Sequence, residues 1–329
     1  ITAVCGADET ITASYTLTVT VIQGSDGDKR QYSYDETDKE SVTVYVTISN
    51  DGVPIKGSDG TVLAHREITV PYFDLEAQDL GDYSRYHTAN GRGSYVDDDV
   101  IERPTALHLY LYLLGIYCQG YTPEQVTRGE KIILGSNCLY QYSDLLGEPT
   151  KADFTNRTLS ISGGATSMYM QNFWGHDENL MYYRNHMYPL MSPGWGSTAD
   201  YILLSDNDTI DLAMFTDREF YKRGAFASFD KDSYTVAAGK TLTFSTQKCD
   251  TRPVSEGGGG AIQPITGLMV SVYNSSWEEV GQISAEDSEY EYTFNDPGTY
   301  YLLAMDPEAG TTRACIAPAT ACVTVTAAS

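Results

Sequence analysis

The sequence predicts a mainly β protein with a small helical part (α+β), in which strands around one buried helix are followed by a β-sandwich. Three observations carry this prediction. Segments in which polar and apolar residues alternate occur towards both ends of the chain. One long apolar segment, residues 105–117, interrupts them. After residue 222 the chain changes to short strands with a turn signal every dozen residues or so, as in a sandwich.

Strands are predicted first at residues 12–22, 41–49 and 61–72. In residues 12–22 threonine alternates with apolar residues, which is the period of a half-buried strand. The second strand ends at the sequence NDG (50–52), and the third begins after SDG (58–60). Both triplets are strong turn signals, so we expect separate strands here.

Two helices are predicted next. Acidic residues and Pro104 precede the segment TALHLYLYLLGIY, and acids before a proline in the first turn suit the helix dipole. Because this helix is apolar on nearly all sides, we expect it to be buried. A second, short helix should begin at Thr122 as N-cap, with Gln125 at the third helical position, and end near Gly129.

Strands return at residues 166–174, 178–188 and 199–216, the last with a tight turn at 206–208. The order of a strand pair, a buried helix and further strands is that of a β-grasp-like domain, one sheet packed on one helix. We therefore predict a first domain, residues 1–222, made of strands and helix and containing this β-grasp-like unit.

The second predicted domain, residues 223–329, is an immunoglobulin-like β-sandwich. Within it, the sequence DPGTY (296–300) resembles the turn and tyrosine corner of immunoglobulin-like folds. Its strands are expected near residues 233–237, 241–247, 267–273, 289–294, 299–305 and 315–326.

Charge and hydropathy exclude some classes of function. The 329 residues carry a formal net charge of −24, which disfavours nucleic acid as a partner because phosphates need a basic surface. No apolar stretch approaches the roughly 20 residues that cross a bilayer, so membrane insertion is not expected. Since the sequence opens on Ile1 without a signal peptide, we expect a segment of a larger exported protein, secreted or at the cell surface.

The six cysteines include no C-x-x-C pair, which argues against a zinc ribbon and a thioredoxin-like site. Cys315 and Cys322 lie seven residues apart around Pro318, and Cys118 and Cys138 flank a short excursion of the chain. Both pairs fit local disulfides in an exported protein, and buried free thiols are the alternative.

Several segments between residues 40 and 220 resemble the transcobalamin-like C-terminal domains of bacterial surface proteins. They are PYFDL, the helix PTALHLYLYLLGIY, the hairpin YYRN and the strand DYIL, within a longer similar stretch. The resemblance implies a β-grasp fold. The vertebrate proteins that give the family its name bind cobalamin with a second domain that we do not find here, so no cofactor is predicted.

The acidic, tyrosine-rich composition, with an immunoglobulin-like module beside this domain, resembles the starch adherence proteins of gut bacterial amylosomes. That resemblance implies non-catalytic binding of α-1,4-glucan chains. The 26 tyrosines agree with it, because a tyrosine combines a flat apolar face with a polar tip, although tyrosine also fills ordinary sheet positions.

Candidate binding residues gather between positions 171 and 195, where two of the three tryptophans lie. A glucan site needs an aromatic face for the sugar ring and polar side chains for its hydroxyl groups, and this segment offers both. Tyr182 and Tyr183 should face opposite ways, so at most one of them joins a given surface. For each tryptophan, packing in the core is the alternative. The predicted carbohydrate-binding residues are Gln171, Asn172, Trp174, His176, Asp177, Tyr183, Tyr188, Trp195 and, at a turn of the second domain, Trp277.

No catalytic or metal site is predicted. His176, Asp177 and His186 are near one another, but neither H-E-x-x-H nor P-C-x-x-C follows. Asp206, Asp208 and Asp211 offer oxygens for calcium without the glycine and glutamate of an EF-hand loop. The sequence also has no G-x-S-x-G and no complete P-loop, whereas a pair of glycosidase carboxylates stays open among 45 acidic residues.

We therefore predict a non-catalytic extracellular carbohydrate-binding protein, with starch-type α-1,4-glucan as the polysaccharide partner. The alternative is a surface adhesive or spacer module that docks another cell-surface protein, and a glycoside hydrolase is a third hypothesis.

Overall fold

The fold is seen in a computed structural model that describes residues 38–73, 102–129, 181–187, 202–217, 219–251, 262–283 and 287–328. Ala199 and the backbone of several short strands outside these ranges are also described. The described residues are mostly strands with a few short helices, which confirms the mainly β class. No helix in this part of the chain is long and apolar enough to cross a membrane.

One mixed sheet forms the first half of the described structure, here called the N-terminal lobe. Its strands lie in the order β11, β14, β3, β5, and β4 pairs with the end of β3. The two central strands, β3 and β14, are parallel, and each outer strand is antiparallel to its neighbour. The strands are β3 (Ser41–Asn50), β4 (Val53–Pro54), β5 (Arg66–Pro71), β11 (Leu180–Arg184) and β14 (Thr209–Met214).

The buried helix is α1 (Ala106–Leu113), and it begins differently from the prediction. Thr105 is the N-cap: its hydroxyl accepts from the His108 backbone, and the His108 ring bonds back to Thr105 in a capping box. Pro104 therefore precedes the cap, and the first turn contains no acidic residue. The prediction assumed that acidic residues in the first turn stabilise the helix dipole, whereas the Thr105–His108 capping box stabilises this helix start.

Two further helical turns follow α1. A π-helical turn, Leu114–Cys118, continues it, with the Gln119 backbone N–H donating to the Leu114 carbonyl five residues back. The second predicted helix is confirmed as α2 (Pro123–Thr127), capped by Thr122 and Gln125.

The core of the N-terminal lobe lies between α1 and the sheet. Every side chain of α1 is buried, which confirms the prediction from its apolar circumference. Alternate residues of the central strands face the helix, because successive side chains of a strand point to opposite faces. They are Val42, Val44, Val46 and Ile48 from β3 and Ile210, Leu212 and Met214 from β14.

The second half, here called the C-terminal lobe, is a β-sandwich. One sheet has the order β18, β17, β15, β23 with β21 paired to β17, and the other has the order β16, β24, β22, β19, β20. The bounds are β15 (Ala225–Phe229), β16 (Ser233–Ala237), β17 (Thr241–Asp250), β18 (Gln263–Pro264), β19 (Met269–Asn274), β20 (Glu279–Ile283), β21 (Glu289–Thr293), β22 (Gly298–Met305), β23 (Ile316–Ala317) and β24 (Ala319–Thr326).

Five of the predicted strands of this lobe are found with small shifts of their ends. The strand predicted at residues 315–326 is two strands, β23 and β24, which belong to different sheets. The tyrosine-corner contact is also present: the Tyr300 hydroxyl donates to the Asp296 carbonyl at 3.0 Å. The prediction missed β15, β18 and β20. At Gly281 in β20 the Tyr292 ring lies where a side chain would be, so glycine leaves room for that ring.

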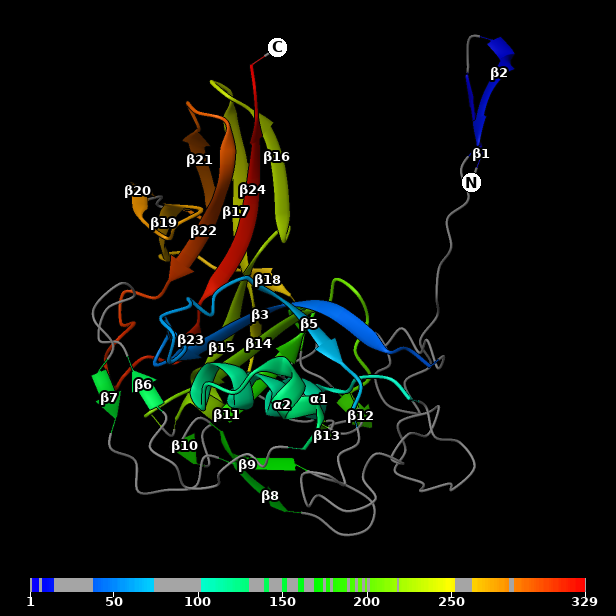
Figure 1. Ribbon diagram of the computed structural model, residues 1–329. Helices are drawn as coiled ribbons and strands as arrows, with labels where there is room; N and C mark the ends of the chain where they lie inside the picture. The colour runs from blue at the N-terminus through cyan, green and yellow to red at the C-terminus, as the bar shows by residue number, and fades with distance from the viewer. Residues whose placement is uncertain are drawn as a thin grey trace.

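The two lobes stack as layers (Figure 1). The helices α1 and α2 lie on one side of the mixed sheet, and the sandwich stands on its other side. The short helix α3 (Phe220–Arg223) connects β14 to the first sandwich strand. It contains the predicted boundary at residue 222, which stays a prediction.

The cysteines differ in part from the prediction. Cys118 is disulfide-bonded, and the side chain of its partner lies outside the described residues. Cys249, Cys315 and Cys322 are thiols that form no disulfide. The predicted Cys315–Cys322 disulfide is therefore wrong: Cys322 lies within β24 with its side chain on the face turned away from the sandwich core, whereas Cys315 packs beside α3.

Candidate functional site

The two lobes share a continuous interface. Side chains on the face of the mixed sheet opposite α1 meet the outer face of the sheet that contains β24. Thr47 and Thr320 are both buried there, and their hydroxyl oxygens lie 2.9 Å apart. A second apolar cluster joins Tyr183 and Phe215 of one lobe to Phe226 of the other.

Tyr183, one of the predicted sugar-binding residues, belongs to this interface. Its ring is fully buried and stacks on Phe226 at a centroid distance of 3.8 Å, while its hydroxyl donates to the Asp250 carbonyl. It therefore has no face left for a ligand, and the prediction for this residue is corrected. Tyr182 points the opposite way, as alternation requires, and packs on the helix core.

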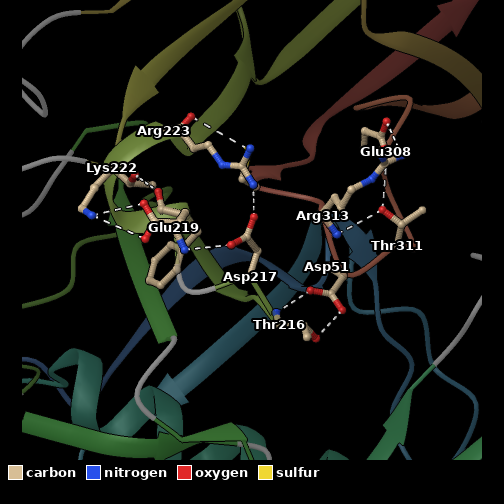
Figure 2. Close-up of polar contacts among 12 residues, drawn as sticks. Asp51, Thr216, Asp217, Glu219, Lys222, Arg223, Glu308, Thr311 and Arg313 are labelled. Carbon is tan, nitrogen blue, oxygen red and sulfur yellow. Dashed lines mark hydrogen bonds and ion pairs between the residues drawn. The ribbon is translucent and has the colours of Figure 1, made fainter.

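Polar contacts surround the connection between the lobes (Figure 2). The Asp51 carboxylate accepts bonds from the Thr216 backbone at 2.6 Å and hydroxyl at 2.8 Å. The Asp51 carbonyl accepts from Gly310 of the C-terminal lobe. Gly52 has a positive φ of 78°, and a Cβ there would lie 3.0 Å from the Ile316 carbonyl. This turn of the N-terminal lobe is thus fitted tightly against the sandwich.

A buried ion pair fixes the turn that follows β11. Arg184 is 1% exposed and directs two nitrogens at one oxygen of Asp208, at 2.7 and 2.8 Å. The same carboxylate accepts from the Asn185 side chain and the Ser205 backbone. Asp208 therefore organises two turns of the N-terminal lobe beside the interface.

His186, two residues beyond β11, bridges the lobes. Its Nε2 lies 2.5 Å from Asp232 of the C-terminal lobe, and its Nδ1 lies 3.7 Å from Asp211 of β14. Burial opposes protonation of the ring, but the two carboxylates outweigh it and raise the pKa of His186 to about 10. His186 is thus a cation between two carboxylates at neutral pH.

A pocket of about 580 Å³ opens where the two lobes diverge, next to this bridge. Its size falls within the range of small-ligand sites, and both lobes supply its walls. The lining residues come from β3, β5 and the segment before it, the turn before β14, the start of β16 and the residue before it, the β19–β20 turn, β22 and β24. They are Tyr45, Ala64, His65, Arg66, Glu67, Asn207, Asp232, Ser233, Trp277, Tyr301, Cys322 and Thr324.

Two pairs of stacked rings line the pocket. Trp277 stacks on Tyr301 with centroids 4.8 Å apart and planes 4° from parallel, and Tyr45 stacks on His65 at 5.0 Å. Trp277 has a φ of +59°, a backbone region rare for bulky residues, because it closes the β19–β20 turn with its N–H on the Asn274 carbonyl. This turn sets the indole against Tyr301.

Burial favours the uncharged form of three groups in the pocket: His65, Tyr301 and Cys322. Burial lowers the pKa of His65 to about 4, and its buried Nδ1 makes no hydrogen bond with another described residue. Burial likewise raises the pKa of Tyr301 and of the Cys322 thiol. Glu67 and Asp232 provide carboxylates, while Asn207, Ser233 and Thr324 provide neutral groups. The pocket thus combines ring faces with hydrogen-bonding groups.

The other predicted site residues are placed only in part. Trp174 and Tyr188 lie outside the described residues. Gln171 and Asn172 lie in β9 (Tyr169–Phe173), His176 and Asp177 form β10, and Trp195 begins β13 (Trp195–Gly196), each described by its backbone alone. The β9–β10 pairing sets Asn172 opposite Asp177. These predictions stay predictions.

Trp277 is the predicted residue that the structure brings into the pocket. The sequence signal that located it was the turn Asn274-Ser275-Ser276 before it. Its partners Tyr45, His65 and Tyr301 were missed, because they lie on other strands and no local pattern links them.

The carboxylates considered for calcium have other partners: Asp206 pairs with Lys39, Asp208 with Arg184, and Asp211 faces His186. Within the residues that the structure describes, no three His, Cys, Asp or Glu side chains are grouped to hold a metal ion.

Comparison with known proteins assigns the chain to no family. No protein-family model matches the chain, and neither does any curated protein. Among solved structures, the N-terminal four Ig domains of Dscam1 isoform 8.4 match 37% of this chain at 14% identity and a TM-score of 0.18. Those of isoform 4.44 match 36% at 15% identity and a TM-score of 0.19. The matched part spans 23% of those chains, and likeness at this level carries no argument about function.

Proposed function

We propose that the protein is a non-catalytic carbohydrate-binding module and that the pocket between its lobes holds the sugar, with starch-type α-1,4-glucan as the polysaccharide. The observation that carries the proposal is the parallel Trp277–Tyr301 stack in a pocket that also contains Tyr45 and carboxylates. An aromatic ring binds the C–H face of a sugar, and carboxylates accept bonds from its hydroxyl groups.

The fold names from the sequence belong to the same proposal. A β-grasp-like N-terminal lobe is supported by the order β5, β3, β14, β11, with a parallel central pair and the helix packed on one face. An immunoglobulin-like C-terminal lobe is supported by the two facing sheets and the Tyr300 contact. Export is supported by the disulfide at Cys118, because disulfides persist in oxidising compartments.

The test is depletion of the full chain onto insoluble starch, with cellulose as the control polysaccharide and reducing-sugar release followed in the same tube. Depletion on starch without sugar release supports the proposal. Sugar release would make the protein a hydrolase, and no depletion on either polysaccharide would overturn the proposal in favour of the spacer or protein-docking module.

Trp277→Asn should weaken starch binding about tenfold, which corresponds to ~1.4 kcal/mol. Asparagine tolerates the positive φ at this turn better than most residues, so the variant removes the ring with little strain in the backbone. Binding isotherms on starch give the affinity. Ile262→Ala is the matched control, since it removes an exposed apolar side chain outside the pocket and should bind like the wild type.

A third variant, Trp174→Ala with Trp195→Ala, tests the site predicted from sequence. If it loses starch binding while Trp277→Asn keeps it, the glucan site lies with Trp174 and Trp195 and the pocket assignment is wrong.

A further inference from the structure

In each lobe a strand near its start runs parallel to the last strand of the lobe and pairs with it. In the N-terminal lobe β3 pairs with β14 through six register pairs, from Tyr45 opposite Thr209 to Asn50 opposite Met214. In the C-terminal lobe β16 pairs with β24 through five, from Ser233 opposite Cys322 to Ala237 opposite Thr326. The sandwich repeats this arrangement once more, because β15 is parallel to β23.

This pairing decides how tension along the chain reaches the hydrogen bonds. Tension enters β3 at Ser41 and leaves β14 at Met214, so it pulls two parallel strands from opposite ends. The strands must then slide past each other, and all bonds of the ladder resist together. Two antiparallel strands joined by a turn would instead be peeled apart, one bond after another.

Bonds beyond the ladders extend both pairs. In the N-terminal lobe the Tyr45 N–H donates to the Asp208 carbonyl and the Asp51 N–H to the Met214 carbonyl, both at 2.8 Å. In the C-terminal lobe the Cys322 N–H donates to Asp232 and the Ala238 N–H to Thr326, both at 2.9 Å.

The ladder between β3 and β14 is also shielded from water. All six residues of β14 are buried, between the helix core on one face and the sandwich on the other. A backbone bond that water cannot reach has no competing partner while it is stretched, which raises the cost of breaking it.

From this geometry we infer a further function: the chain is a link that withstands tension, with β3–β14 and β16–β24 as its two mechanical clamps. The inference does not depend on the ligand of the pocket. On this inference the two lobes transmit force from the chain that precedes β3 to the chain that follows β24.

Single-molecule force spectroscopy on the full chain tests this. With handles at Ile1 and Ser329, opening of the sandwich over residues 225–326 should release about 35 nm, at roughly 3.4 Å per residue. The control carries one handle at Lys240, an exposed turn residue after β16, and the other at Ser329. Both handles then pull on the same end of the β16–β24 pair and peel it apart.

The sandwich should open at a force at least about twofold higher in the first geometry than in the second, because five register pairs break together rather than in turn. Equal forces in the two geometries, or gradual extension at low force with end-to-end handles, would overturn the inference. Because both measurements use the same folded chain, a difference in stability cannot produce the result.

Discussion

Replacing Asp208 by alanine should lower the free energy of unfolding by about 3–5 kcal/mol. The change removes the carboxylate from Arg184, a residue that is 1% exposed. It also removes the acceptor of the Asn185 side chain and of the Ser205 backbone. The loss is large because the pair is buried, where an ionic contact is screened little by water.

Asp206→Ala is the matched control for this prediction. Asp206 lies in the same turn and also pairs with a cation, Lys39, but its side chain is 46% exposed. An exposed pair is screened by water, so this variant should lose less than about 1 kcal/mol. Urea unfolding of both variants gives the two values. Equal losses would show that burial does not set the strength of the Arg184–Asp208 pair.

Stability should pass through a maximum near pH 6.5, since two interface histidines shift in opposite directions. The folded-state pKa of His65 is about 4, below the unfolded value of 6.5. As pH falls from 6.5 to 4, the unfolded chain takes up a proton that the folded chain refuses. At ~1.36 kcal/mol per unit, this histidine alone costs about 3 kcal/mol across that window.

His186 produces the alkaline side of the maximum. Its folded-state pKa is about 10, so its contribution is fully present below the unfolded value of 6.5 and is lost as pH rises towards 10. The loss amounts to about 4–5 kcal/mol across that range. Burial also raises the pKa of Asp211, which opposes the His65 effect just above the unfolded carboxyl value of 3.8.

Denaturant unfolding from pH 4 to pH 10 measures this profile, and two variants assign its sides. His65→Asn should flatten the acid side, and His186→Asn should flatten the alkaline side. Both positions have positive φ, 44° and 62°, which asparagine tolerates well. An acid side that is unchanged in His65→Asn, or an alkaline side that is unchanged in His186→Asn, would refute the corresponding assignment.

Local patterns predicted those features that depend on residues close in the chain. Turn signals at the ends of short strands located β3, β16 and β22, and the T-x-x-Q pattern at Thr122 located the cap of α2. The Tyr300 contact followed from the five residues that make it. Each is decided within one turn or one strand, so one segment of sequence contains the whole signal.

Trp277 is the one pocket residue that was predicted from the sequence, because the walls of the pocket come from distant parts of the chain. Tyr45 and Tyr301 meet through the docking of two sheets, and no spacing in the sequence encodes that. Tyr183 shows the opposite error: its sequence pattern fits an exposed hairpin, but the neighbouring lobe covers it. Sequence patterns give the faces of an element without saying which face a second lobe will bury.

The π-helical turn at Leu114–Cys118 affects how this helix is compared with others. Such a turn is equivalent to one residue inserted into an α-helix, and each residue advances an α-helix by about 100°. Removing one residue there would leave a continuous helix but rotate Cys118, the disulfide-bonded cysteine, to another side. An alignment with a protein whose helix has no π-helical turn therefore needs a one-residue gap between Leu114 and Cys118. Without the gap, Cys118 would be aligned with a residue on another side of that helix.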